Sequence, residues 1–214
     1  MGKLVSLIIV ILILAACAAQ VETVEDMGDR NKEIVEVNEW MARGYEAYKN
    51  KDYDKAIEYY KKAIVLNPNL AKAHYNLGTN YSNKGMLDEA ISEFEQVLTI
   101  DPDYAEAHNN LGNVYSEKGM VDESLSEYEK AITINPDLPQ AQYNIGFSYL
   151  QKGLNSLAAD HLLKAGLLYL EKGDKESALV TYEVLKRTDS EEQEKTLFEK
   201  LYPGGEQGEK DPQK

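Results

Sequence analysis

The sequence predicts an all-α fold built as a solenoid of stacked helical hairpins. The first observation is a repeat, because the 34 residues of Ala71–Tyr104 are followed without a gap by a near copy in Ala105–Leu138. The two copies share residues that shape a helical hairpin, namely Gly78 and Gly112, Tyr81 and Tyr115, Gly85 and Gly119, Phe94 and Tyr128, and Pro102 and Pro136. A fixed period of this length without insertions is typical of stacked repeats and not of a globular core.

The second observation is that each copy reads as two short helices. A helical pattern over residues 71–84 reaches Gly85, which suits a tight turn, and a second amphipathic run ends at Pro102. The small side chains of Gly78 and Ala90 let the two helices approach closely. One hairpin cannot bury its apolar faces alone, so neighbouring hairpins are expected to stack.

These residues resemble the tetratricopeptide repeat family, whose pattern is an aromatic residue, then Leu-Gly, Tyr, Gly, Ala, an aromatic, Ala and Pro. The pattern continues upstream through Trp40, Gly44, Ala56, Tyr60, Ala63 and Pro68, and downstream through Ile145, Gly146, Tyr149, Gly153, Ala158 and Ala165. The resemblance implies a right-handed α-solenoid with four repeats from Val37 to about Lys172.

The end of the array departs from the regular pattern. A fifth copy starts at Ala159, only twenty residues after Pro139, so residues 156–170 are expected to form one long helix that serves two hairpins. Helices over 175–187 and 191–201 are expected to follow. The predicted segments are a signal peptide over 1–17, an acidic tether over 18–30, repeats over 31–70, 71–104, 105–138 and 139–172, a degenerate fifth repeat with a capping helix over 173–202, and a disordered tail over 203–214.

The amino terminus carries a targeting signal. Lys3 precedes the apolar run Leu4–Leu14, which is typical of a secretory signal, and Leu14-Ala15-Ala16-Cys17 resembles a bacterial lipobox. The resemblance implies that Cys17, the only cysteine of the chain, is lipidated and becomes the first residue of the mature protein. Ala18 directly after it implies the outer membrane, if the cell has two membranes. The alternative is an uncleaved anchor.

The charge and the residue types disfavour several classes of function. The formal net charge of −14, from 37 acidic and 23 basic residues, disfavours binding to nucleic acid. His74 and His108 occupy the same repeat position, but no further ligand completes a metal site, so both are expected to pack between helices. No nucleophile, base and oxyanion donor can be assembled, so neither catalysis nor a cofactor is expected.

The candidate binding site is the concave face of the array. In the family that the chain resembles, the sixth residue of each repeat projects into the groove, and here it is Asn76, Asn110 and Asn144. Carboxamides offer both donor and acceptor to an extended peptide backbone, and the set resembles the asparagine ladder of the O-linked N-acetylglucosamine transferase repeats. The alternative is that these asparagines support the fold.

The other expected groove residues are aromatic or polar: Tyr45, Tyr75, Thr79, Asn109, Asn113, Tyr143 and Phe147. The carboxylate clamp known in the family is not expected, because its lysine and arginine positions hold Met41, Glu106 and Asn110 in this chain. The groove therefore suits an extended segment of mixed polar and apolar character.

These features together predict a membrane-anchored scaffold that binds extended segments of other proteins, with a lipid anchor facing the periplasm or exterior of a bacterial envelope. Two alternatives stay open. The array could be a structural protein that associates with itself, or the substrate-recruiting subunit of a modifying enzyme complex.

Overall fold

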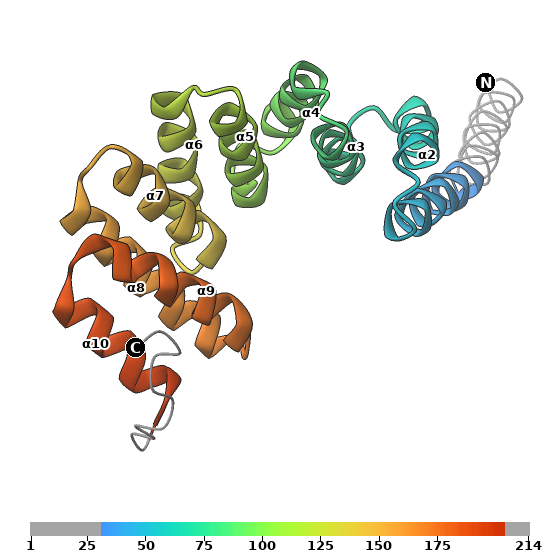
Figure 1. Ribbon diagram of the computed structural model, residues 1–214. Helices are drawn as coiled ribbons and strands as arrows, with labels where there is room; N and C mark the ends of the chain where they lie inside the picture. The colour runs from blue at the N-terminus through green and yellow to red at the C-terminus, as the bar shows by residue number, and fades with distance from the viewer. Residues whose placement is uncertain (1–30, 204–214) are drawn as a thin grey trace, which may run out of the picture. The chain divides into compact units, whose positions relative to one another are not determined.

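The computed structural model describes residues 31–203, and within this range the secondary structure is helical, with no strand. A helix covers residues 31–49. The helices that follow in Figure 1 are α2 (Tyr53–Leu66), α3 (Ala71–Asn83), α4 (Leu87–Ile100), α5 (Ala105–Glu117), α6 (Val121–Ile134), α7 (Pro139–Gln151), α8 (Asn155–Glu171), α9 (Lys175–Leu185), the short 3-10 helix η1 (Lys186–Thr188) and α10 (Glu191–Leu201). The all-α solenoid class of helical hairpins is therefore confirmed.

Glycines turn the chain inside the hairpins, as the sequence predicts for two of them. Gly85, Gly119, Gly153 and Gly173 all have a positive φ, between 72° and 76°. A side chain is disfavoured in this left-handed region, which explains the choice of residue. Lys51 stands at the same position of the first hairpin and also adopts a positive φ, of 58°.

The described residues divide into two compact units, 31–80 and 81–203, which are described separately. In the first unit, the helix over residues 31–49 and α2 form a hairpin in which Gly44 lies against the ring of Tyr60. The core of this unit joins the buried residues Val37, Ala63 and Ala73 to a partly buried rim of Trp40, Met41, Ile64, Leu66 and Leu70.

In the second unit, close helix contacts depend on residues without a side chain. A Cβ atom added to Gly112 of α5 would lie 2.5 Å from Cε1 of Tyr128 in α6, and one added to Gly146 of α7 would lie 2.7 Å from Cγ of Leu162 in α8. Both distances are far below ordinary contact. The small residues therefore allow each pair of helices to pack at short range, as the sequence indicated for Gly78.

The far end of the second unit follows the predicted departure from the repeat. α8 has 17 residues against 13 in α7, and it packs on α7 as well as on α9, so the long shared helix is confirmed. Figure 1 shows α10 alongside α8 and α9. The helix covers their apolar residues with Leu197 and Leu201, which are buried in a core that also contains Ala159, Leu162, Ala178 and Leu185.

Between residues 31 and 203, none of the helices is both long enough and apolar enough to cross a membrane. Cys17, the signal peptide, the tether and residues 204–214 of the predicted tail lie outside the described residues.

Candidate functional site

A pocket in the first unit contains two of the predicted groove residues, Tyr45 and Asn76. Its volume is about 460 Å³, and it lies between the helix over residues 31–49 and the beginning of α3. The lining residues are Asn38, Met41, Ala42, Tyr45, Leu70, Lys72 and Asn76. None of them is acidic, although the chain carries a net charge of −14.

The carboxamide of Asn76 has no partner among the described residues, although its backbone carbonyl accepts a hydrogen bond of 2.7 Å from Nδ2 of Asn80. The Asn76 side chain is half-buried, and the ring of Tyr45 is 57% exposed. An unpaired carboxamide at the edge of a pocket can both donate to and accept from a ligand. The two other predicted residues of α3 contact each other, since the Thr79 hydroxyl donates to the Tyr75 carbonyl over 2.9 Å.

The predicted carboxamides of the second unit are bonded to one another. Nδ2 of Asn144 in α7 donates to Oδ1 of Asn109 over 3.0 Å and to Oδ1 of Asn113 over 2.8 Å, both in α5. Asn113 also accepts from the Tyr128 hydroxyl over 2.9 Å, and Nδ2 of Asn109 donates to Oδ1 of Asn110 over 3.3 Å. This carboxamide network (Asn109, Asn110, Asn113 and Asn144) joins α5 to α7.

The structure thus places the three asparagines of the predicted ladder in different surroundings. Asn76 faces a pocket without a bonded neighbour, while Asn110 and Asn144 belong to the carboxamide network. The side chains opposite each asparagine, one repeat earlier in the sequence, explain the difference. Asn144 contacts Asn109 and Asn113, and the residues at the corresponding positions beside Asn76 are Met41 and Tyr45.

The last two predicted groove residues, Tyr143 and Phe147, stack on one another along α7. Their ring centroids lie 6.3 Å apart with an interplanar angle of 13°. Both side chains are half-buried, and Tyr143 also packs against the core beneath α8 and α9. Their role in peptide binding stays a prediction.

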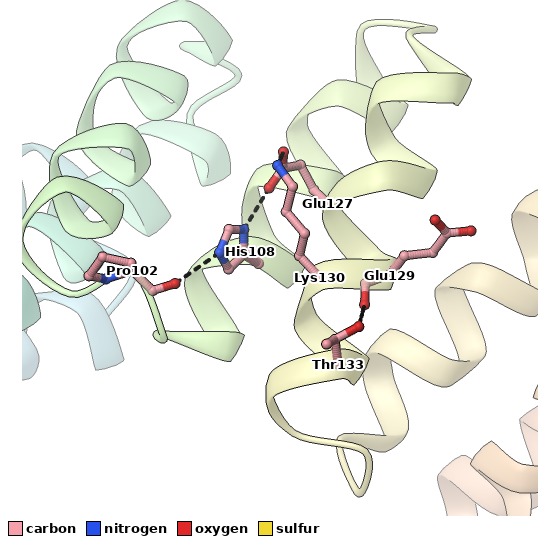
Figure 2. A network of polar contacts seen from close by, with 6 residues as sticks. All are labelled: Pro102, His108, Glu127, Glu129, Lys130 and Thr133. Carbon is pink, nitrogen blue, oxygen red and sulfur yellow. Dashed lines mark hydrogen bonds and ion pairs between the residues drawn. The ribbon is translucent and has the colours of Figure 1, made fainter.

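A buried hydrogen-bonded pair lies inside the second unit, at a histidine that the sequence predicted to be a packing residue (Figure 2). Nδ1 of His108 lies 2.6 Å from Oε2 of Glu127, and Nε2 lies 3.2 Å from the Pro102 carbonyl oxygen. The two ring nitrogens of His108 therefore lie against two oxygen atoms, one of the Glu127 carboxyl group and one of the Pro102 backbone. Glu127 also accepts a bond of 2.6 Å from Lys130.

Burial opposes the charge on Glu127, but the hydrogen bonds from His108 and Lys130 outweigh it and lower the pKa of that carboxyl from its ordinary value. The same pair of positions holds different chemistry in other repeats. In the next repeat, His161 donates to Oε1 of Gln142 over 2.8 Å, and burial lowers the pKa of the His161 ring. In the first repeat, the rings of Trp40 and Tyr59 stack at 5.7 Å.

The pair of His108 and Glu127 therefore joins α5 to α6, the two helices of one hairpin, and its role is structural. Among the described residues, no cluster of His, Asp and Glu could hold a metal ion. The sequence analysis did not predict a role for Glu127, nor for Lys72, which lines the pocket beside Asn76. The spacing of 19 residues, which recurs from His108 to Glu127 and from Gln142 to His161, is the signal that could have identified the pair.

Models of the tetratricopeptide repeat match most of the described chain. A model described as "TPR repeat" matches residues 80–119 and 112–153, and models described as "Tetratricopeptide repeat" match residues 37–70, 59–92 and 160–191. The chain belongs to the tetratricopeptide repeat family. No curated protein sequence matches it significantly.

Three solved structures with this fold are similar to the chain over most of their own lengths. The MamA protein is 24% identical, with a TM-score of 0.56, and the match covers 77% of this chain and 96% of MamA. The pilF protein of Pseudomonas aeruginosa is 16% identical, with a TM-score of 0.57 and coverages of 81% and 95%. The first TPR of Spaghetti, bound to an HSP90 peptide, is 18% identical, with a TM-score of 0.53 and coverages of 55% and 94%. These similarities show the fold.

Proposed function

We propose that the chain is a protein-interaction scaffold that holds an extended segment of a partner protein on the concave face of its repeats and performs no catalysis. The pocket beside Asn76 carries this proposal, because an unpaired carboxamide stands there next to the exposed ring of Tyr45. An extended peptide presents unpaired N–H and C=O groups that such a carboxamide can bind. Family membership supports the proposal, as does the solved TPR of Spaghetti with its bound peptide.

Crosslinking in the native host tests the scaffold. A photo-crosslinking phenylalanine derivative replaces Tyr45 at the pocket or, as a control, Val180 in α9, since the two side chains are 57% and 54% exposed. The derivative at position 45 is expected to capture a defined partner that the one at position 180 does not. Equal capture at both positions, or none at 45, would refute a site at this pocket.

The second part of the proposal is a lipid anchor at Cys17 that holds the scaffold on a bacterial envelope membrane. It is supported by the apolar run Leu4–Leu14 and by the lipobox-like Leu14-Ala15-Ala16-Cys17. In a bacterial host, Cys17→Ser should abolish incorporation of labelled fatty acid and flotation with membranes. Unchanged labelling would place the lipid elsewhere, and flotation without any labelling would favour an uncleaved apolar anchor.

A further inference from the structure

Lys72 occupies an unfavourable position for a lysine. It lies in the first turn of α3, where the helix dipole favours negative charge, and α3 has no acidic residue in that turn. The following repeats have Glu106 and Gln140 at the same position. None of the ion pairs found among the described residues includes Lys72. The helix therefore gains no stability from this charge.

The surroundings of Lys72 combine a positive charge with an apolar floor. Met41 and Leu70 line the pocket and also pack on the buried core of the first unit, so their positions are fixed. No carboxylate lines the pocket to neutralise the ammonium group. A ligand that fits these surfaces carries an apolar side chain next to a negative charge.

We propose that this pocket selects a partner segment in which an apolar residue is followed by a glutamate or aspartate. The apolar side chain lies on Met41 and Leu70, the carboxylate pairs with Lys72, and the neighbouring peptide group pairs with Asn76. The inference rests on the proposed scaffold function and adds the chemistry of the segment. The lining of the pocket contains one lysine and the chain has a net charge of −14, so the pocket suits one acidic side chain better than a polyanion.

Fluorescence anisotropy with short labelled peptides tests the selection, using the full chain purified in detergent. The peptides are acetylated and amidated at their ends, and they contain Leu-Glu, Leu-Gln or Ser-Glu at the centre of an otherwise constant sequence. Leu-Glu is expected to bind about tenfold more tightly than either of the others, since each loses one of the two contacts. A Leu-Gln peptide with a free carboxyl terminus tests whether Lys72 instead binds the terminal carboxylate of a chain.

Charge reversal on the protein completes the test. Lys72→Glu copies the residue of the next repeat, so α3 should fold as well or slightly better, while the preference for Leu-Glu over Leu-Gln disappears. Lys164→Glu, in the exposed middle of α8, makes the same change in net charge and should leave the preference intact.

The inference is overturned by equal binding of Leu-Glu and Leu-Gln, by a preference that survives Lys72→Glu, or by binding only of the free carboxyl terminus. Failure to bind any of the peptides would also overturn it. None of these results refutes the scaffold itself, because partner capture at position 45 is measured independently in the host.

Discussion

Asn76 and Asn144 hold the same position in two repeats, but their carboxamides differ in hydrogen bonding. In the first unit Asn76 borders a pocket beside Met41 and Tyr45 and forms no side-chain bond among the described residues. In the second unit Asn144 donates to Asn109 and Asn113. The comparison teaches that a recurring polar residue in a repeat array can lie without a bonded neighbour in one unit and join helices in another, depending on the residues opposite.

The first prediction disturbs the second unit alone. Gly112→Ala places a Cβ 2.5 Å from the Tyr128 ring, and moving that ring also removes the hydroxyl that holds Asn113. The free energy of unfolding should fall by about 2 kcal/mol, measured by urea denaturation of the full chain. Ser126→Ala, on the exposed surface of α6, is the control and should change it by less than about 0.5 kcal/mol.

At a temperature where the Gly112→Ala protein is still folded, its capture of the partner should equal that of the wild type. A parallel loss of capture would show that the second unit contributes directly to binding.

The second prediction converts the pocket into a copy of the network. Tyr45→Asn places a carboxamide at the position that Asn113 holds beside Asn144, so Asn76 can bond to it. Pull-down of the partner identified by crosslinking should weaken about tenfold, because the ligand then competes with an internal hydrogen bond. Tyr45→Phe keeps the ring and should retain most of the binding. Normal binding by the asparagine variant would separate Asn76 from recognition.

The third and smallest effect concerns the turn of the first hairpin. Lys51 adopts a positive φ of 58° where the other hairpins have glycine, so Lys51→Gly should relieve strain. The greater freedom of glycine in the unfolded chain offsets part of the gain, which leaves a stabilisation of about 0.5 kcal/mol. Partner capture should not change. Thermal unfolding checks the sign, and a lower midpoint would show that the Lys51 side chain supports the turn.

The fold could be predicted closely because its determinants are periodic. The turn at Gly119 and the long helix α8 follow from spacing alone, and both are observed. The candidate site could be predicted only in part. The sixth position identified the asparagines, but their bonding depends on side chains one repeat earlier, which differ between Met41 in the first repeat and Asn109 in the third.

Two features depend on contacts between helices, which the periodic pattern of apolar residues and glycines does not show. The partner of His108 is 19 residues away in the second helix of its hairpin, so the buried hydrogen bond between His108 and Glu127 forms only when the helices pack. The sequence alone does not indicate a role for Lys72, because lysine is a common residue in helices. Lys72 becomes a candidate binding residue only because it lines a pocket that contains no carboxylate.

The most direct test measures stability and binding together in Asn76→Ala and Asn144→Ala. Asn76→Ala should leave the thermal midpoint unchanged or slightly higher, because alanine is the better helix former, while pull-down of the partner weakens about tenfold. Asn144→Ala should lower the free energy of unfolding by about 2 kcal/mol, because it removes the hydrogen bonds that Asn144 donates to Asn109 and Asn113, while binding stays normal. The opposite pattern, with Asn76→Ala unstable and Asn144→Ala unable to bind, would contradict the division of roles between the two units.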